Sequence, residues 1–319
     1  MNGFALPRLG LGCATQGNLL QKRTDDEAHA VFDAAWEAGI RHFDTAPHYG
    51  LGLSERRLGR FLATKPREEF VLSTKVGRLL RPDPDWDGAS QDAQGFVVPA
   101  DVRRLWDVSL AGVRASLAES LVRLGLDRVD ILYLHDPESS GIEGAVERGI
   151  ESLATLREEG TVGQIGAGSM NRDTLLAAVD TGLTDLLMVA GRYTLLDQSI
   201  GPEVLAACAE NGTGIVAAAV FNSGVLAEAP RPDAMFDYAR VPAEVLARAS
   251  RIAEVCASHG VELPTAALHY PLLDHRVESV VVGAASPTHV RQNFARLQEN
   301  VPGGLWADLE KLGLVPRCA

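Results

Sequence analysis

Four side chains that could together move a proton follow short apolar segments of the sequence: Asp44, Tyr49, Lys75 and His135. An ammonium beside a phenol favours the phenolate, so we expect Lys75 to lower the pKa of Tyr49. Such a tyrosine is expected to be partly ionised and can exchange a proton with a substrate oxygen near neutral pH, while a histidine fixes that oxygen by a hydrogen bond. A lysine buried at a strand end is costly unless it is paired, and Asp44 is the expected counter-charge.

Each of these residues also has an ordinary structural interpretation. Asp44 could cap the turn that follows it, and Tyr49 could pack on its own loop. A lysine at a strand end often extends to solvent, and a single histidine is often a hydrogen-bonded core residue. The conjunction of all four at one rim favours the catalytic interpretation. We take the neighbouring His48 as a substrate contact from the same loop.

The elements that must position these residues alternate along the chain between short apolar runs and longer amphipathic stretches. The apolar runs predict eight strands, at 9–13, 41–45, 70–76, 129–135, 164–168, 186–190, 215–220 and 279–283. The amphipathic stretches predict helices at 25–38, 108–124, 145–159, 172–181, 202–211 and 242–259, and a further helix begins near Ser54. Thr24 followed by Glu27 fits a capping box at the start of the first helix.

Strands that are continuously apolar are typical of a parallel sheet with both faces buried. Eight of them separated by helices predict a (β/α)8 TIM barrel, which we place in a single domain over residues 1–319. Catalytic groups of such barrels lie at the carboxyl ends of the strands, where the four residues above are expected.

One segment, 77–107, departs from this alternation. It contains three prolines, is too polar and broken for the core, and exceeds the usual length of a connection, so we expect a functional loop or lid at the carboxyl face. Trp86 and Trp106 are its candidate substrate contacts, with Phe96 beside them. The alternative is that these rings pack under the lid, because stacking on a sugar and ordinary packing look alike in a sequence.

Composition excludes several classes of function. The 319 residues carry a net charge of −12 and no dense basic patch, which argues against nucleic-acid or anionic membrane partners. The first residues lack a basic segment before a long apolar core, so we expect no signal peptide and a cytoplasmic location. Four scattered cysteines, Cys13, Cys208, Cys256 and Cys318, predict buried or idle thiols and no metal site. No oligomeric state follows from the sequence.

The chain resembles the aldo-keto reductase superfamily over nearly its whole length. The string HFDTA…YG…SE…LG at 42–59 carries the resemblance most specifically, with STKVGR, RVDILYLHDP, IGAGS and VVVGAASPTHVRQNF following in order. This resemblance implies a barrel enzyme without a metal, a catalytic tetrad of Asp44, Tyr49, Lys75 and His135, and hydride transfer between a nicotinamide and a carbonyl or alcohol carbon.

The same resemblance implies a set of cofactor contacts. Ser169 and Asn171 match the pair that holds the carboxamide of the nicotinamide. The turn after the seventh strand and the segment after the last strand would approach the pyrophosphate and the adenine. These contacts are Phe221, Asn222, Ser223, Gly224, Gly283, Ala284, Ala285, Ser286, Arg291, Gln292 and Asn293. For the turn at 221–224, the alternative is an ordinary strand-to-helix connection.

Cofactor preference is predicted from a departure. Relatives selective for NADP place a cation early in the last loop, whereas this chain has Gly283, Ala284 and Ala285. Without that cation a desolvated 2′-phosphate loses charge-assisted hydrogen bonds, so we expect NAD to be preferred, with NADP as the alternative if Arg291 or His289 compensates.

The segments FNSG at 221–224 and GRYTLLDQ at 191–198 resemble a group containing aldose 1-dehydrogenases of the L-fucose and D-threo-aldose type and pyridoxal 4-dehydrogenases. This predicts oxidation of the hemiacetal C1 of an aldose to a lactone, with a small sugar or aldehyde as substrate. The alternatives are pyridoxal 4-dehydrogenase activity that forms 4-pyridoxolactone, general NADPH-dependent aldehyde reduction, and a redox-sensing subunit that binds nucleotide without turnover.

Overall fold

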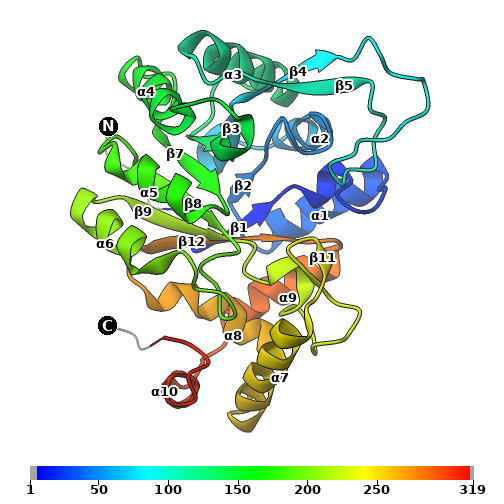
Figure 1. Cartoon of the computed structure of the whole chain (residues 1–319). Helices are drawn as coiled ribbons and strands as arrows, with labels where there is room; N and C mark the ends of the chain where they lie inside the picture. The colour runs from blue at the N-terminus through cyan, green and yellow to red at the C-terminus, as the bar shows by residue number, and fades with distance from the viewer. Residues whose placement is uncertain (1–5, 317–319) are drawn as a thin grey trace.

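A closed barrel of eight parallel strands forms the centre of the computed structural model, which describes residues 6–316 (Figure 1). Around the barrel the strands follow the order β1-β12-β9-β8-β7-β6-β3-β2. Their bounds are β1 Leu9–Gly12, β2 His42–Asp44, β3 Val71–Val76, β6 Ile131–His135, β7 Gln164–Ser169, β8 Leu186–Ala190, β9 Gly214–Ala218 and β12 Val277–Gly283. All eight predicted strands overlap these elements, so the predicted TIM barrel is confirmed.

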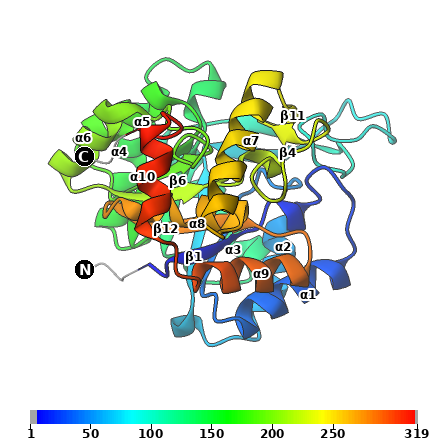
Figure 2. The same ribbon diagram turned by 90° about the horizontal axis from the view of Figure 1, so that it is seen from below.

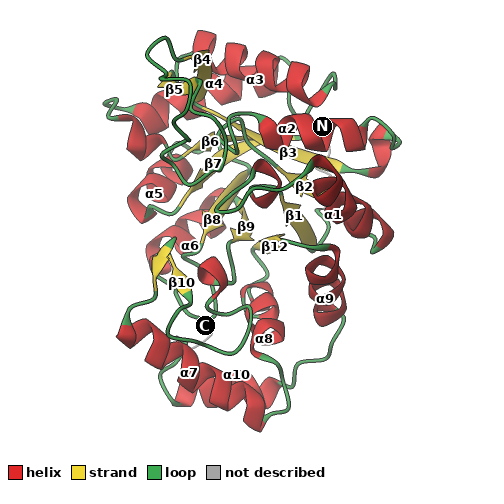
Figure 3. Cartoon of the chain, turned by 90° about the vertical axis from the view of Figure 1, so that its right-hand side faces the viewer, coloured by secondary structure: helices red, strands yellow, loops and turns green. Residues whose placement is uncertain are grey.

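Helices surround the strands on the outside (Figure 3). Their bounds are α1 Asp25–Glu37, α2 Leu53–Leu62, α3 Leu110–Leu124, α4 Ala145–Glu158, α5 Arg172–Asp180, α6 Gly201–Asn211, α7 Ala243–Ser258, α8 Leu263–His269, α9 Pro287–Leu297 and α10 Gly303–Lys311. The predicted capping box is present, because Thr24 accepts a hydrogen bond from the Glu27 amide and the Glu27 carboxylate accepts one from Thr24. Helix α9 returns the chain beside α1, as Figure 2 shows.

The two-residue period of the strands divides their side chains between two environments. In β6, Leu132 and Leu134 belong to the large cluster that packs the strands against the helices, whereas Ile131 and Tyr133 belong to the smaller cluster inside the barrel. The interior next to β2 and β3 is polar instead. There, buried His42 lies between the hydroxyls of Ser73 and Ser279, at 3.3 and 3.5 Å.

Two insertions decorate the carboxyl face of the barrel. The segment 77–107 contains an antiparallel hairpin of β4 Arg78–Pro82 and β5 Val102–Trp106. The sequence did not predict these two strands, because Pro82 and several arginines lie within them. The second insertion, after β9, forms a short hairpin of β10 Met235–Phe236 and β11 Ala239–Arg240.

The carboxyl-terminal part of the chain packs away from the strand ends. Helix α10 lies beside α7, and Leu305 and Leu309 are buried in a cluster with Ile252 of α7 and Ala266 of α8 (Figure 3). Cys13, Cys208 and Cys256 are buried free thiols, and Cys318 lies outside the described residues. Within residues 6–316, no helix is long and apolar enough to cross a membrane.

Candidate active site

A cavity of about 360 Å³ opens at the carboxyl ends of the barrel strands. Every strand of the barrel contributes one of its last residues to the lining: Gly12, Asp44, Lys75, His135, Ser169, Ala190, Ala218 and Gly283. Three of the four predicted catalytic residues are in this ring, and Tyr49 joins them from the loop after β2. The barrel therefore brings together Asp44, Tyr49, Lys75 and His135 as the sequence predicted.

Asp44 and Lys75 form a buried ion pair in the lining of the cavity. The Lys75 ammonium donates to Asp44 Oδ2 at 2.6 Å and to the Thr45 carbonyl at 2.9 Å, and both charged side chains are at most 4% exposed. Ser73 donates to the other carboxylate oxygen at 2.7 Å. Burial alone would lower the pKa of Lys75, but the negative charge of Asp44, together with Tyr49, outweighs burial and raises it. Lys75 is therefore a fixed cation.

Tyr49 lies over this cation, with the Lys75 nitrogen 4.8 Å from the centre of its ring. The ring of His135 stands almost perpendicular to the ring of Tyr49, with 5.8 Å between the two ring centres. Lys75 does act to lower the pKa of Tyr49, as predicted, but burial dominates and the net shift is upward. The expectation of a partly ionised phenol near neutral pH is therefore wrong for the free protein, because the cost of burying a phenolate exceeds the attraction of one paired ammonium.

His135 is a neutral imidazole in this environment. Burial holds its pKa well below the ordinary value, and the cations Arg78 and Lys75 lower it further. Its Nε2 lies 3.4 Å from Asp136 Oδ2, and the pKa of this carboxyl is raised to about 6, chiefly by burial. Asp136 lines the cavity but was not singled out from the sequence. Its position directly after a strand-end histidine was the available signal.

The three predicted substrate contacts do not line the large cavity. His48 is not among the residues that line the large cavity; it packs edge-on against Phe96 and His135, at 5.2 and 5.4 Å between ring centres. Trp86 lies near the tip of the long insertion and donates to the Ser90 carbonyl. Trp106, in β5, lines a separate polar pocket. Neither tryptophan lines the large cavity, and contact of Trp86, Trp106 or His48 with a substrate stays a prediction.

The two residues assigned to the nicotinamide carboxamide have different environments. Ser169, the last residue of β7, lines the cavity and donates to Glu138 at 2.6 Å. Asn171 is the cap of α5, where its side-chain oxygen accepts from the Thr174 amide at 2.9 Å. The structure therefore places Ser169 but not Asn171 in the cavity, since the cap requires the side chain to turn back onto its own helix.

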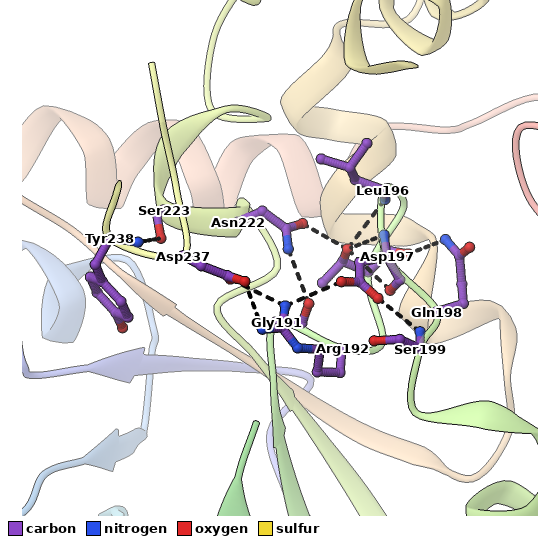
Figure 4. Close-up of polar contacts among 11 residues, drawn as sticks. Gly191, Arg192, Leu196, Asp197, Gln198, Ser199, Asn222, Ser223, Asp237 and Tyr238 are labelled. Atoms are coloured by element: carbon purple, nitrogen blue, oxygen red, sulfur yellow. Dashed lines mark hydrogen bonds and ion pairs between the residues drawn. The ribbon is translucent and has the colours of Figure 1, made fainter. Parts of the chain in front are cut away.

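The predicted phosphate turn, Phe221 to Gly224, lines the cavity in full. Its backbone is unusual, because Asn222 and Ser223 both have left-handed φ angles, of 46° and 59°. Asn222 is held by two hydrogen bonds, donating to the Gly191 carbonyl and accepting from the Thr194 hydroxyl (Figure 4). The two segments that marked the sequence subgroup are therefore joined to each other. Their contacts stabilise a turn that its own residues disfavour.

Some residues of the segment after β12 line the cavity, and others belong to the core or to helix α9. Gly283 and Ala285 line the cavity, whereas Ala284 is buried in the core. Ser286 caps α9 by accepting from the His289 amide. Beyond it, Gln292 is exposed, Asn293 is buried, and exposed Arg291 lies 3.6 Å from Glu37 of α1. His289, one turn into the helix, lines the cavity where Arg291 does not.

Two residues at this end were missed by sequence reasoning. Arg23 donates to the carbonyl of Ala285 at 2.8 Å across 262 positions of sequence, and nothing near Arg23 in the chain announces this contact. Tyr238 reaches the cavity from the tip of the β10–β11 hairpin. It follows Asp237, and both have left-handed φ angles, of 61° and 48°.

The Tyr238 hairpin is fixed to the barrel by polar contacts that Figure 4 shows. Arg192 binds both carboxylate oxygens of Asp237, at 2.6 and 3.1 Å, and also contacts Asp197. The Tyr238 amide donates to the Ser223 hydroxyl at 3.2 Å. The phosphate turn and Tyr238 of the hairpin thus line the cavity, and the segment after β8 holds both in place through Gly191, Thr194 and Arg192.

Comparison with known proteins agrees with this geometry. The model of the aldo/keto reductase family matches residues 8–312. D-threo-aldose 1-dehydrogenase from a Pseudomonas species is 54% identical over 316 residues, which cover 98% of this chain and 96% of that protein. Pyridoxal 4-dehydrogenase from Microbacterium luteolum is 36% identical, with the same coverage. L-galactose dehydrogenase from Arabidopsis thaliana is 29% identical and covers 98% of this chain and 88% of its own length.

Solved structures share the fold. An aldo-keto reductase from Bacillus halodurans superposes with a TM-score of 0.75 at 24% identity, covering 96% of this chain and 92% of its own. A glycerol dehydrogenase from Gluconobacter oxydans superposes with a TM-score of 0.72 at 18% identity, covering 98% and 94%.

Proposed function

Because this chain belongs to the aldo/keto reductase family and is an NAD(P)-dependent oxidoreductase, we propose that it oxidises the hemiacetal C1 of an aldose to a lactone. The observation that supports this best is the complete strand-end constellation of Asp44, Tyr49, Lys75 and His135 in a chain 54% identical to a D-threo-aldose 1-dehydrogenase. An intact proton-transfer site also argues against a redox-sensing subunit without turnover.

The protonation states of the four residues determine the role of each in the proposed reaction. Neutral His135 donates a hydrogen bond that holds the C1 oxygen in place. Tyr49 exchanges a proton with that oxygen: the phenol donates it when a carbonyl is reduced, and the phenolate accepts it when an alcohol is oxidised. Lys75, held by Asp44, stabilises the phenolate by its charge. A bound nicotinamide supplies the acceptor or donor of the hydride.

The chain's residues fit a nicotinamide dinucleotide. One side of the cavity consists of small residues that leave room for a flat ring: Ala190, Ala218, Ala219 and Gly283. A Cβ atom at Gly224 would meet nothing within 4 Å, so the turn exposes bare backbone to the cavity. Helix α9 begins at Pro287, between Ala285 and His289 that line the cavity, and helix N-termini attract phosphate groups. Ser169 would hold the carboxamide, and Ser223 and Gly224 the pyrophosphate.

We further propose that NAD is preferred over NADP. Residues 283–285 carry no cation, and Arg291 lies against Glu37 rather than in the cavity. The cation that does reach this loop, Arg23, already donates to the Ala285 carbonyl. We expect kcat/KM for NAD to exceed that for NADP by about tenfold or more. Because Arg23 is engaged in this way, Arg23→Met should change the ratio of the NAD value to the NADP value by less than about twofold. A wild-type preference for NADP would overturn the assignment.

A second candidate, the oxidation of pyridoxal to its lactone, is favoured by the 36% identical pyridoxal 4-dehydrogenase. Its substrate also forms a cyclic hemiacetal, so the same four residues could perform the chemistry. An assay that follows reduced cofactor with L-fucose, D-threo-aldoses and pyridoxal separates the two. Higher kcat/KM for an aldose supports the proposal, and higher kcat/KM for pyridoxal replaces it. Activity confined to NADPH-dependent aldehyde reduction would reject both.

A further inference from the structure

An ion pair outside the four catalytic residues joins the catalytic cavity to a neighbouring polar pocket, because Asp136 lines the cavity and Arg78 lines the pocket. Asp136 lines the cavity next to His135, and its Oδ2 accepts from Arg78 Nη2 at 2.7 Å. Arg78 is the first residue of β4, in the long insertion, and its side chain is 8% exposed. The pair therefore joins the end of a barrel strand to the insertion that covers it.

Arg78 is held rigidly by its surroundings. Its guanidinium lies over the ring of Trp106 at 4.5 Å, and Trp106 is the residue opposite it in the β4–β5 ladder. A guanidinium that is stacked and also paired with a carboxylate loses little further freedom when it binds a ligand. The pair is thus preorganised.

Both members have hydrogen-bonding capacity left over. Among the described residues, Oδ1 of Asp136 and Nη1 of Arg78 have no hydrogen-bond partner, and Nε of Arg78 is buried without one. One side of the pair can accept a hydrogen bond and the other can donate one. This complements two neighbouring hydroxyl groups, one of which donates while the other accepts.

The position of the pair fits a polyhydroxylated substrate. Asp136 Oδ2 is 3.4 Å from His135 Nε2, so it adjoins the place where the substrate oxygen is fixed. Elsewhere the lining includes the apolar side chains Met188, Val220 and Phe221. Arg78 itself lines a second, polar pocket of about 320 Å³ together with Gln94, Arg104 and Ser139.

We propose that the Arg78–Asp136 pair binds the hydroxyl groups adjacent to the reacting carbon and so selects polyhydroxylated substrates over unsubstituted aldehydes. The inference rests on the proposed function in one respect, the assumption that the substrate is sugar-like. A site built around the hydroxyls of a substrate discriminates strongly against an analogue that lacks them, because the polar groups of the site are then left unpaired.

The test compares two aldehydes of equal carbon number in the reducing direction, D-glyceraldehyde and propanal, with reduced nicotinamide cofactor. The measured quantity is the ratio of kcat/KM for glyceraldehyde to that for propanal. We expect Asp136→Ala to lower this ratio by about tenfold or more, and Arg78→Met, which keeps the stacking on Trp106, to lower it by several-fold. Comparing variants with wild type cancels the intrinsic reactivities of the aldehydes.

Controls separate selection from structural effects. Glu143→Gln removes an exposed carboxylate from the loop that follows β6 and should leave the ratio unchanged. If Asp136→Ala does not fold, Asp136→Asn carries the same comparison with the shape of the side chain retained. A parallel fall for both aldehydes would mean that Asp136 only positions His135, and would overturn the proposal. An unchanged ratio in both Asp136→Ala and Arg78→Met would overturn it too.

This experiment is independent of lactone formation. If wild-type protein oxidises no aldose but its ratio falls in the variants, the proposed function fails and the hydroxyl recognition stands. If wild-type protein oxidises aldoses but the ratio is the same in the variants, the proposed function stands and the hydroxyl recognition fails.

Discussion

The cavity has two sides that are built by different means. On the side of β2, β3 and β6, catalytic groups come from strand ends or the loop next to them, and a buried ion pair fixes them. On the side of β9 and β12, the lining consists of small residues and of turns with left-handed backbones, held by contacts between segments far apart in sequence. In the proposed function, proton transfer thus depends on the regular strands, and cofactor binding depends on the irregular loops.

The ion pairs on the two sides of the cavity also differ in their burial. The Asp44–Lys75 pair is at least 96% buried, so breaking it leaves a charge without solvent. The Arg192–Asp237 pair, which holds the Tyr238 hairpin, is 19% and 33% exposed, and water can replace either partner. Changes on the first side should therefore abolish turnover or folding, whereas changes on the second should adjust affinity.

The largest effect is expected for Tyr49→Phe. Removing the hydroxyl removes the proton carrier, so kcat should fall by about 1000-fold while dinucleotide binding, measured by fluorescence titration, changes little. Tyr193→Phe is the matched control, because its hydroxyl is also partly buried but donates to Asp274 outside the cavity lining. Equal activity of Tyr49→Phe and wild type would remove the proton-transfer role.

Breaking the buried ion pair should have the next largest effect. Lys75→Met leaves the Asp44 carboxylate buried and unpaired, which should lower the free energy of unfolding by about 3–5 kcal/mol in urea denaturation. The double variant Asp44→Asn with Lys75→Met contains no unpaired charge and should recover most of that loss, although not the activity. Equal stability of the single and double variants would contradict the assignment.

The pH dependence of oxidation follows from the raised pKa of Tyr49. Because burial keeps the phenol protonated, only a small fraction is phenolate at pH 7, and this fraction grows as the pH rises. The kcat for oxidation should therefore increase from pH 7 to 10, by up to about tenfold per pH unit until another step limits the rate. Reduction, which uses the protonated phenol, should show no such increase. A flat profile for oxidation would show that Tyr49 ionisation does not limit turnover.

The smallest effect is expected at the Tyr238 hairpin. Asp237→Asn weakens a partly exposed ion pair, so unfolding should change by no more than about 1 kcal/mol. Because the hairpin places Tyr238 in the cavity, KM should rise several-fold with kcat within about twofold of wild type. Asp233→Asn makes the same change in the same loop, where Asp233 is 78% exposed beside Arg231, and should have no effect. A large loss of kcat in Asp237→Asn would contradict the claim that changes on this side of the cavity alter affinity alone.

The two sides also differ in what the sequence could predict. Apolar runs of strand length located all eight strands, and the strand ends located Asp44, Lys75 and His135, because the period of a strand fixes which residues reach the rim. The net pKa of Tyr49 was predicted wrongly, since burial by the rest of the fold outweighs one neighbour. Pattern reasoning therefore found the groups but not their protonation.

On the binding side, prediction was less complete. The turn 221–224 was found by its resemblance, but Arg23 and Tyr238 were missed, because no local pattern reports a contact with a distant loop. Trp86 and His48 were chosen for their chemistry alone, and neither lines the cavity: Trp86 donates to the Ser90 carbonyl, and His48 packs against Phe96 and His135. Asn171 was assigned to the cofactor although a residue before a helix is a natural cap.

The central claim, that C1 of an aldose loses hydride at the strand-end site, can be tested with an aldose carrying deuterium at C1. We predict that wild-type protein forms one lactone for each reduced cofactor, that the deuterium appears on the nicotinamide, and that Tyr49→Phe forms neither product at a comparable rate. Reduced cofactor without deuterium, or turnover without lactone, would contradict the account.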